Sequence, residues 1–392
     1  MKINTMNFPE RIVYGPGSLG SIGEEAGKEG SRALIVSDNI MKKLGYLETC
    51  EKALHESGLH SAAFLDIETE PTDTYVEKAL EMVKQENADV IIALGGGSCI
   101  DTAKAVAVLA NNEGAIKDYM NNKKTAAYKA LPLIAVPTTA GTGSEATDVT
   151  VITNTADGVK MMIKQPAFMP KAAVIDSQLS MSSPKSIKAA TGMDALTHAI
   201  EAYISKKAHV FSDQLALSSA KLIMHNILKS YEDKEDTHAA EQMALGAMQG
   251  GMAFSNASVC LVHGMSRPIG AMFHVPHGIS NAMLLPVILE YSSDSCRSRL
   301  SELAAFIYPE WADLPEEEAA GRFVNKVLEL CQKLDIPNMK GWGIEEDAYH
   351  QVLEKMASDA LESGSPGNNP IVPTEKEIIA LYEKAYVYEY TN

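Results

Sequence analysis

The sequence predicts an α/β domain followed by an all-helical domain, and two features of its periodicity carry this prediction. Up to about residue 180, short runs of β-branched residues alternate with amphipathic helical stretches. Beyond Pro184 the strand pattern almost vanishes, and apolar residues recur at helical spacing. Alternating strands and helices are typical of a largely parallel sheet covered by helices on both faces. We therefore expect two domains, residues 1–183 and 184–392, with a boundary near Ser182-Ser-Pro184.

Four short apolar runs in the first half have the length and composition of buried strands. They are residues 33–37, 88–94, 131–136 and 172–176. Residues 74–83 lie between two of these runs and show the spacing of an amphipathic helix. Residues 147–162, with valines and threonines around Asp157-Gly158, indicate a β-hairpin inserted before the last strand.

Helical spacing in the second half extends over residues 213–228, 241–254, 317–334 and 374–386. The stretch 191–198, Thr-Gly-Met-Asp-Ala-Leu-Thr-His, indicates the start of a further helix. The sequence contains no internal repeat and no low-complexity tract. These patterns predict that the second domain is built of helices alone.

The composition is that of an ordinary soluble globular protein, with 392 residues, 46% of them hydrophobic and 22% charged. The formal net charge of -17 argues against binding to nucleic acid or to anionic membranes, because both need basic patches. The N-terminal residues contain no signal-peptide core, and no apolar run approaches the ~18 residues that span a bilayer. The five cysteines are scattered without a C-x-x-C pair. We expect a reduced, cytoplasmic protein.

A glycine-rich loop follows the predicted strand 88–94, with the sequence Leu94-Gly-Gly-Gly-Ser-Cys-Ile-Asp-Thr-Ala-Lys104. Glycines let the backbone approach a phosphate closely, and free N–H groups at the start of a helix bind anions. The loop matches neither G-x-G-x-x-G nor a Walker motif, so a tight turn without a ligand is the alternative. Because three consecutive glycines cost chain entropy, we favour the phosphate-binding interpretation.

A second polar loop, Val136-Pro-Thr-Thr-Ala-Gly-Thr-Gly-Ser-Glu145, follows another predicted strand. Loops at the carboxyl ends of parallel strands gather at one edge of the sheet. Two such loops predict a nucleotide-binding site on the first domain. Asp38 ends the first predicted strand, where a carboxylate could accept hydrogen bonds from ribose hydroxyls and repel a 2′-phosphate. The alternative for Asp38 is that it caps the helix that follows.

Four residues of the second domain form a set typical of metal ligands: Asp194, His198, His263 and His277. On a helix, the spacing of four between Asp194 and His198 places both side chains on one face. Three imidazoles and one carboxylate suit Fe²⁺, Zn²⁺ or Co²⁺ and can leave a coordination position open for a substrate oxygen. The chain has ten histidines, and the alternative is that these four residues are not ligands.

Taken together, these motifs resemble those of the iron-containing (group III) alcohol dehydrogenases, a family that includes lactaldehyde reductase and 1,3-propanediol dehydrogenase. The matching segments are Gly95-Gly-Gly-Ser98 with Asp101 and Lys104, Pro137-Thr-Thr-Ala-Gly-Thr142, Gly192-x-Asp194-Ala195 with His198, His263-Gly264, Pro276-His-Gly278, Asp359 and Asn369-Pro370. They extend over essentially the whole chain.

The resemblance implies a dehydroquinate synthase-like architecture, in which a dinucleotide-binding α/β domain and a helical domain enclose a nicotinamide cofactor. It implies a divalent metal, commonly iron with zinc as the alternative, bound by Asp194, His198, His263 and His277. The pyrophosphate would be bound by Gly96, Gly97 and Ser98, next to Gly95, and the rest of the cofactor path lined by Asp101, Thr138, Thr139, Thr142 and Lys160. Asp38 matches the acidic position of members that use NAD(H) rather than NADP(H). A homodimer fits the family.

The sequence departs from the family pattern at two positions. Arg267 stands where many relatives have a histidine close to the active site, and Glu70 stands where some have an asparagine near the adenosine. A guanidinium binds carboxylate, sulfonate or phosphonate groups and cannot act as a general acid near neutrality. Arg267 therefore indicates a small anionic aldehyde, unless it pairs with a local carboxylate. His274 could then carry the proton, with a solvent-facing role as the alternative.

We therefore expect reversible, metal-dependent reduction of a small aldehyde to a primary alcohol, with sulfoacetaldehyde or a semialdehyde among the candidate substrates. The chain shows no convincing arrangement for a protein nucleophile. The alternatives are a polyol enzyme similar to glycerol dehydrogenase, a hydroxyacid–oxoacid transhydrogenase and a dehydroquinate synthase-like lyase. A non-catalytic nucleotide-binding scaffold would leave the four metal-type residues unexplained.

Overall fold

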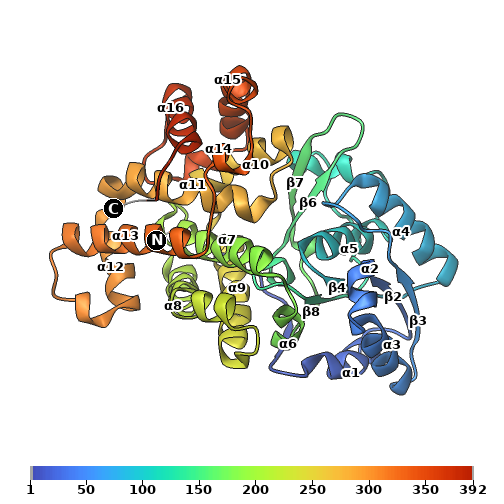
Figure 1. Cartoon of the computed structure of the whole chain (residues 1–392). Coiled ribbons are helices and arrows are strands. Elements are labelled where there is room, and N and C mark those ends of the chain that lie inside the picture. Colours follow the sequence, from blue (N-terminus) through green and yellow to red (C-terminus); the bar gives the residue numbers. More distant parts are fainter. Residues whose placement is uncertain (1–2, 391–392) are drawn as a thin grey trace. The chain divides into compact units, whose positions relative to one another are not determined.

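The computed structural model describes residues 3–390, which form two compact units (Figure 1). One unit runs from Thr5 to Ser183, and the other comprises the chain from Pro184 onward together with the described residues 3 and 4. The first is an α/β unit and the second is built of helices. Among the residues described, no helix is long and apolar enough to cross a membrane.

The α/β unit is built on a six-stranded sheet with the order β1-β8-β5-β4-β2-β3, in which every pair of neighbouring strands is parallel. Its strands are β1 (Arg11–Tyr14), β2 (Arg32–Val36), β3 (His60–Phe64), β4 (Val90–Gly95), β5 (Leu133–Pro137) and β8 (Ala172–Ile175). Its helices are α1 (Ile22–Gly27), α2 (Asn39–Lys43), α3 (Tyr46–Glu56), α4 (Asp73–Glu86), α5 (Gly97–Leu109) and α6 (Ser177–Met181). The expected parallel α/β architecture is confirmed.

Helices cover both faces of this sheet because successive residues of each strand point to opposite sides. In β2, Leu34 and Val36 belong to one apolar core, together with residues of α4 and α5. Ala33 and Ile35 belong to the other, together with residues of α1 and α3. A strand buried on both faces needs a continuous apolar run, which is why the central strands could be recognised from sequence.

The outer strands β1 and β3 were not predicted. They lie at the two ends of the strand order and are only partly buried. The sequence of β3, His-Ser-Ala-Ala-Phe, contains no β-branched residue. With one neighbour each, these strands lack the apolar run by which the inner strands were identified. The expected hairpin is confirmed: β6 (Val149–Thr153) pairs antiparallel with β7 (Lys160–Lys164).

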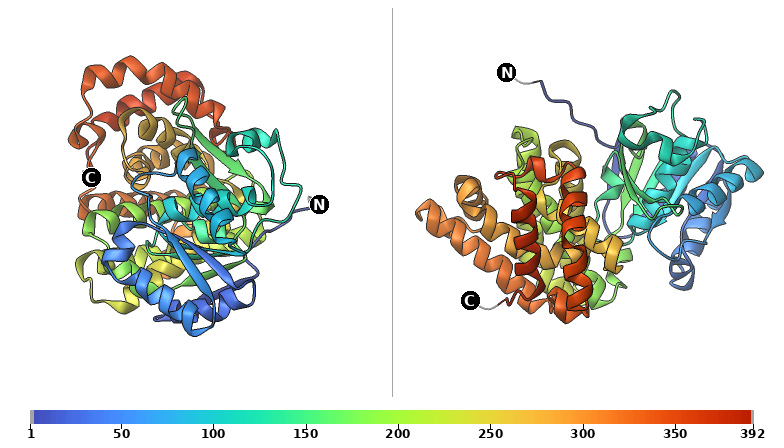
Figure 2. Two further views of the ribbon diagram at one scale, coloured as in Figure 1. Left: turned by 90° about the vertical axis from the view of Figure 1, so that its right-hand side faces the viewer. Right: turned by 90° about the horizontal axis from the view of Figure 1, so that it is seen from above.

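The helical unit contains no strand among its described residues, as expected. Its longer helices are α7 (Lys185–Ile204), α8 (Val210–Glu232), α9 (Thr237–Ala257), α10 (Leu261–Phe273), α11 (His277–Ser292), α12 (Arg297–Ile307), α13 (Glu316–Lys333), α15 (Glu346–Glu362) and α16 (Glu375–Tyr386). The short helix α14 (Met339–Trp342) follows α13. Helices α15 and α16 pack against each other at the C-terminal end of the chain (Figure 2).

One helix boundary differs from the prediction. The stretch 191–198 does not start a helix but lies in the middle of α7, which begins at Lys185 directly after Pro184. Pro184 is the N-cap residue of this helix and has an extended backbone. Thr191 acts as an interior residue, because its hydroxyl donates to the carbonyl of Ile187 at 2.8 Å. Residues Asp194 and His198 are therefore placed by the rigid centre of the helix rather than by its end.

Candidate metal centre and cofactor-binding loops

Helix α7 carries Asp194 and His198 on one buried face. Their exposed fractions are only 2% and 4%. Because residues four apart on a helix are neighbours, the expected arrangement of these two side chains is confirmed. An aspartate is rarely buried without a positively charged or hydrogen-bonding partner, so this position indicates a specific role.

Two further helices bring His263 and His277 to the same place. His263 lies in the first turn of α10 and is buried, whereas His277 is the first residue of α11 and is partly exposed. Helix α11 approaches α7 closely because of Gly278, where a Cβ atom would lie only 2.6 Å from the carbonyl oxygen of Ala190. Glycine at this position therefore allows the first turn of α11, and His277 with it, to pack against α7.

Three of the four expected ligands converge on one point. Asp194 Oδ1 lies 3.7 Å from His263 Nε2 and 3.8 Å from His277 Nε2. The ligand atoms of these three residues all lie within 4.8 Å of one another. Two imidazole nitrogens and one carboxylate oxygen at such separations fit a divalent cation of the iron or zinc type.

His198 is adjacent to this group without belonging to it. Its ring stacks on that of His263, with centroids 4.5 Å apart, and on that of Phe254 at 4.2 Å. Among the described residues, the group whose ligand atoms meet consists of Asp194, His263 and His277. A fourth ligand at His198 thus stays a prediction.

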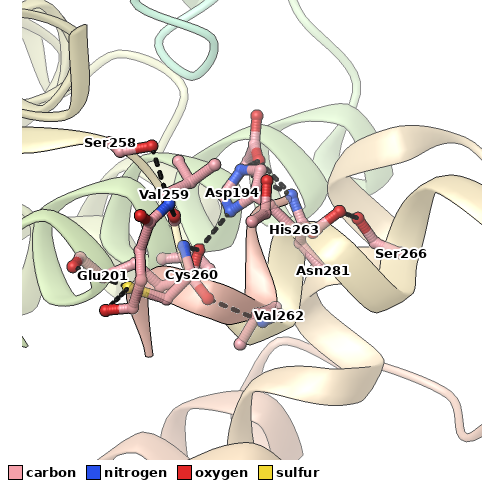
Figure 3. A network of polar contacts seen from close by, with 12 residues as sticks. Asp194, Glu201, Ser258, Val259, Cys260, Val262, His263, Ser266 and Asn281 are labelled. Carbon is pink, nitrogen blue, oxygen red and sulfur yellow. Dashed lines mark hydrogen bonds and ion pairs between the residues drawn. The ribbon is translucent and has the colours of Figure 1, made fainter. Parts of the chain in front are cut away.

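Glu201, one further turn along α7, fixes the orientation of His263 (Figure 3). Its carboxylate accepts hydrogen bonds from His263 Nδ1 at 2.7 Å and from the backbone N–H groups of Cys260 and Val262. Because an ionised carboxylate can only accept, Nδ1 of the imidazole carries a proton, and in the neutral ring Nε2, which faces Asp194, keeps its lone pair. This is the arrangement that a metal-binding histidine requires.

Asp194 and the nearby histidines shift each other's pKa values. Burial alone would raise the pKa of Asp194, but the nearby imidazoles of His198, His277 and His263 lower it well below its usual value. Burial likewise opposes protonation of His263, yet the carboxylates of Asp194 and Glu201 outweigh it and raise its pKa. The carboxylate of Asp194 is therefore ionised across the physiological range.

Asn281 also contributes to this site and was not predicted from the sequence. It lies one turn after His277 on α11 and is completely buried. Its amide nitrogen donates to Asp194 Oδ1 at 2.6 Å and lies 3.1 Å from His263 Nε2 and 3.2 Å from His277 Nε2. Both Asn281 and Glu201 stand at helical spacing from an expected ligand, but that spacing alone does not show which other ligands they reach.

The two predicted loops of the α/β unit lie next to each other at the carboxyl ends of β4 and β5. Gly95 pairs with Pro137 in the sheet, and the N–H group of Thr138 donates to the carbonyl of Gly95 at 3.1 Å. Gly95 has a φ of +158°, and a Cβ there would lie 2.5 Å from Cys99 Sγ. A Cβ at Gly97 would lie 3.0 Å from Thr142. Glycine is thus needed at Gly95, and a side chain at Gly97 would crowd Thr142.

Helix α5 begins within the glycine-rich loop, with Gly96 at its N-cap position and Gly97 and Ser98 in its first turn. The first N–H groups of a helix have no carbonyl partner within it, and they carry a partial positive charge. Gly96, Gly97 and Ser98 are all partly exposed, as is Thr139 across from them. These features suit a pyrophosphate, as the sequence predicts.

A buried polar cluster holds the second loop in place. The ammonium group of Lys104 donates to Ser144, Thr147 and the carbonyl of Val149 at 2.7–2.9 Å. Burial lowers the pKa of Lys104 to about 8. Asp101 accepts from Ser144 at 2.5 Å and from the N–H of Val151 at 2.8 Å, so its carboxylate braces the loop from inside.

Two other expected cofactor residues already have partners in the α/β unit. Asp38 Oδ1 caps α2 by accepting from the N–H groups of Ile40 and Met41, which was the alternative given for it. Its second oxygen faces the glycine-rich loop, 3.7 Å from Cys99 Sγ. Lys160 on β7 forms an ion pair with Glu70, the position at which the sequence departs from the family pattern.

Comparison with known proteins agrees with this geometry. Residues 9–177 match the family model described as iron-containing alcohol dehydrogenase, and residues 188–386 match the C-terminal model of the same family. The chain belongs to the iron-containing alcohol dehydrogenases. The family resemblance, the fold and the class of enzyme expected from the sequence are confirmed.

Members of this family with different names are similar to the chain over almost its whole length. Long-chain-alcohol dehydrogenase 1 of Geobacillus thermodenitrificans is 34% identical, with 98% of both chains covered. Lactaldehyde reductase of Escherichia coli is 33% identical, covering 98% of this chain and all of the relative. The structure of sulfoacetaldehyde reductase from Bifidobacterium kashiwanohense in complex with NAD⁺ has a TM-score of 0.89 at 26% identity, over 99% and 100% of the two chains. Overall similarity therefore does not select the substrate.

In this iron-containing alcohol dehydrogenase, the two expected catalytic residues lie on α10. Arg267 follows His263 by one turn, is largely buried, and donates to the hydroxyl of Ser365 at 3.1 Å. Burial lowers the pKa of Arg267 to about 10, so that its guanidinium is still charged near neutrality. His274 ends the helix in a left-handed conformation and is exposed. Their catalytic roles stay predictions.

Proposed function

We propose that this protein is a metal-dependent, NAD(H)-linked aldehyde reductase that interconverts a small primary alcohol and its aldehyde. The observation that carries the proposal is the convergence of Asp194, His263 and His277 within a buried part of a chain of this family. When bound, a divalent cation supplies Lewis-acid polarisation of the substrate oxygen, and the nicotinamide gives or accepts the hydride.

We propose iron as the resident metal, because the family model that matches the chain is that of iron-containing enzymes. The donor set also suits zinc, since imidazole and carboxylate ligands serve both ions. The protein contributes a fixed negative charge at Asp194 and a lone pair at His263 Nε2, whose direction Glu201 maintains. His198, buried and stacked on His263, is the proposed fourth ligand.

NAD(H) rather than NADP(H) is the proposed cofactor. Asp38 Oδ2 faces the glycine-rich loop, and a carboxylate there would repel a 2′-phosphate while accepting hydrogen bonds from ribose hydroxyls. The N–H groups at the start of α5 would bind the pyrophosphate. A structural relative was determined with NAD⁺ bound.

We propose that the preferred aldehyde carries an anionic group bound by Arg267. A largely buried guanidinium attracts a carboxylate or sulfonate strongly, because water screens the interaction little and the fork of N–H groups matches two oxygens. Its place one turn after His263 brings it to the same side of α10 as a candidate metal ligand. A relative with the same fold is named sulfoacetaldehyde reductase. His274 is the proposed proton carrier, and we propose a cytoplasmic homodimer as the working form.

The test is NADH oxidation by metal-stripped protein, with and without Fe²⁺ added under anaerobic conditions. Propionaldehyde and sulfoacetaldehyde are compared as neutral and anionic substrates. Turnover that requires iron and favours the sulfonate supports both parts of the proposal. Turnover without metal contradicts the metal-dependent mechanism. Cofactor that cycles between a hydroxyacid and an oxoacid without net NADH consumption would instead indicate a transhydrogenase.

A matched variant separates the preference for an anionic aldehyde from the aldehyde reductase activity itself. Arg267→His restores the residue that many relatives have at this position. We expect it to lower kcat/KM for sulfoacetaldehyde at least tenfold relative to propionaldehyde, because the fixed charge is lost. An unchanged ratio of the two efficiencies would remove Arg267 from the substrate site.

A further inference from the structure

The side chain of Asn281 lies at the point where the three candidate ligands meet. Its Nδ2 atom lies 2.6 Å from Asp194 Oδ1, 3.1 Å from His263 Nε2 and 3.2 Å from His277 Nε2 (Figure 3 shows the first two partners). Asn281 comes from α11 and is 0% exposed, so its amide is shielded from bulk solvent.

In these contacts Asn281 Nδ2 can only donate. An amide nitrogen carries two hydrogens and has no lone pair available for a cation. The carboxylate of Asp194 can only accept, and His263 Nε2 is an acceptor in the neutral ring, whose proton is directed to Glu201. Without a cation, the two N–H groups of Asn281 therefore stabilise two of the atoms that would bind one, Asp194 Oδ1 and His263 Nε2, and the nitrogen lies close to the third, His277 Nε2.

The other end of the amide is unsatisfied. Asn281 Oδ1 is buried and has no hydrogen-bond partner in the structure. A buried polar oxygen without a partner destabilises the folded state. The side chain thus has an unused acceptor, Oδ1, bonded to the same carbon as its nitrogen.

A cation at this site reverses the preference of the amide. Metal–ligand bonds to nitrogen and oxygen are about 2.0–2.2 Å long, so a cation shared by Asp194, His263 and His277 would contact the N–H hydrogens of Asn281. Partial positive charge would then face full positive charge. A half-turn of the amide exchanges nitrogen and oxygen without changing the shape of the side chain, and it directs Oδ1 to the cation.

We propose that the amide of Asn281 is a metal-responsive positioning group. Its nitrogen donates to Asp194 and His263, beside His277, before loading, and its oxygen turns toward the cation afterwards. The inference rests on the metal centre of the proposed function and assigns a role to a residue outside the expected ligand set. It also explains why a fully buried amide stands one turn from His277 without satisfying its own oxygen.

Three variants test this role by metal binding rather than by turnover. Asn281→Leu has a similar shape and no polar atoms, Asn281→Asp presents oxygen in either orientation, and Asn226→Leu removes a buried amide that donates to Leu222 elsewhere in the helical unit. The measurements are the Kd for Co²⁺ by chelator competition, the visible spectrum of the Co²⁺ protein, and the Tm of the metal-free protein.

We expect Asn281→Leu to bind Co²⁺ about 10- to 100-fold more weakly, as for other residues that support metal ligands, and to change the Co²⁺ spectrum. Asn281→Asp should bind Co²⁺ at least as tightly as the wild type, but should have a lower Tm without metal because two carboxylates then face each other. Asn226→Leu should retain the wild-type Kd and spectrum.

Wild-type affinity and spectrum in Asn281→Leu would overturn the role of the amide while leaving the metal centre intact. Loss of binding in Asn281→Asp would also overturn it, since the oxygen would then not face the cation. Absence of Co²⁺ binding by the wild-type protein would refute the metal centre itself, and this inference with it.

Discussion

The carboxylate of Glu201 binds the Nδ1 atom of His263 at 2.7 Å, across two helices that are adjacent in space but far apart in sequence. The same carboxylate accepts from two backbone N–H groups at the start of α10. One side chain thus accepts from free backbone N–H groups at the start of α10 and also sets the tautomer of the histidine in its first turn. The candidate metal centre depends on this second function, because only the unprotonated Nε2 can bind a cation.

Glu201→Gln should weaken metal binding without abolishing the fold. Glutamine keeps the size of the side chain, but its neutral oxygen is a weaker acceptor for the Nδ1 proton and its NH₂ group competes for the same place. We expect the affinity for Zn²⁺ or Co²⁺ to fall about 10- to 100-fold, measured by chelator competition. Glu318→Gln, at an exposed ion pair on α13, is the control and should bind metal as the wild type does. Unchanged affinity in Glu201→Gln would show that His263 is oriented by other contacts.

The sequence predicted the parts of this protein whose signal is local. Central strands such as residues 90–95 are buried on both faces, so burial alone makes them recognisable. Asp194 and His198 are a helical pair, and the fixed geometry of a helix brings them together. The edge strand β3 was not recognised because its residues are half exposed and it has only one neighbouring strand, so it lacks a continuous apolar run.

Long-range partners were not predictable in the same way. Asn281 reaches Asp194 across 87 positions of sequence, and only the packing of α11 on α7 shows that the two residues meet. Asp38 illustrates a different limit, because one carboxylate can cap a helix with one oxygen and face a ligand with the other. The local sequence cannot show whether such an aspartate caps a helix, binds a ligand or does both.

Gly278→Ala should disturb the metal centre through the backbone. The added Cβ would lie 2.6 Å from the carbonyl oxygen of Ala190, so α11 must move away from α7 and take His277 with it. We expect the free energy of unfolding to fall by about 1–3 kcal/mol, as for other overpacked sites, together with weaker metal binding. Gly321→Ala on α13 meets nothing within 4 Å and should stabilise the protein by about 0.5–1 kcal/mol. Full metal affinity in Gly278→Ala would mean that His277 does not depend on this contact.

Glu70→Asn should improve cofactor binding by releasing Lys160. Glu70 and Lys160 form an ion pair in which the glutamate is 45% exposed, so its loss should change stability by less than about 1 kcal/mol. If Lys160 lines the cofactor path, its freed ammonium would bind the cofactor phosphates, and KM for NADH should fall several-fold with kcat little changed. Glu10→Gln breaks a comparable exposed ion pair with Lys171 and should leave KM unchanged. A KM for NADH that is equal in both variants would place Lys160 away from the cofactor.

Glu145 makes the α/β unit sensitive to pH. It is 2% exposed, and burial raises its pKa from 4.5 to about 7, although its own N–H group and Lys104 oppose the shift. The folded protein therefore binds this proton more tightly than the unfolded chain, so the contribution to stability is complete below pH 4.5 and is lost as the pH rises through 7. Glu145→Gln cannot ionise and escapes that loss.

We expect Glu145→Gln to match the wild type in free energy of unfolding near pH 4.5 and to exceed it at pH 8, by at most about 3 kcal/mol. Urea denaturation at both pH values measures the difference, and the exposed Glu77→Gln variant on α4 should show no such divergence. A Glu145→Gln protein that is less stable at pH 8 would show that the charged carboxylate is needed beside Lys104. In that case the attraction between the charges of Glu145 and Lys104, rather than the cost of burying Glu145, determines the stability of the second loop.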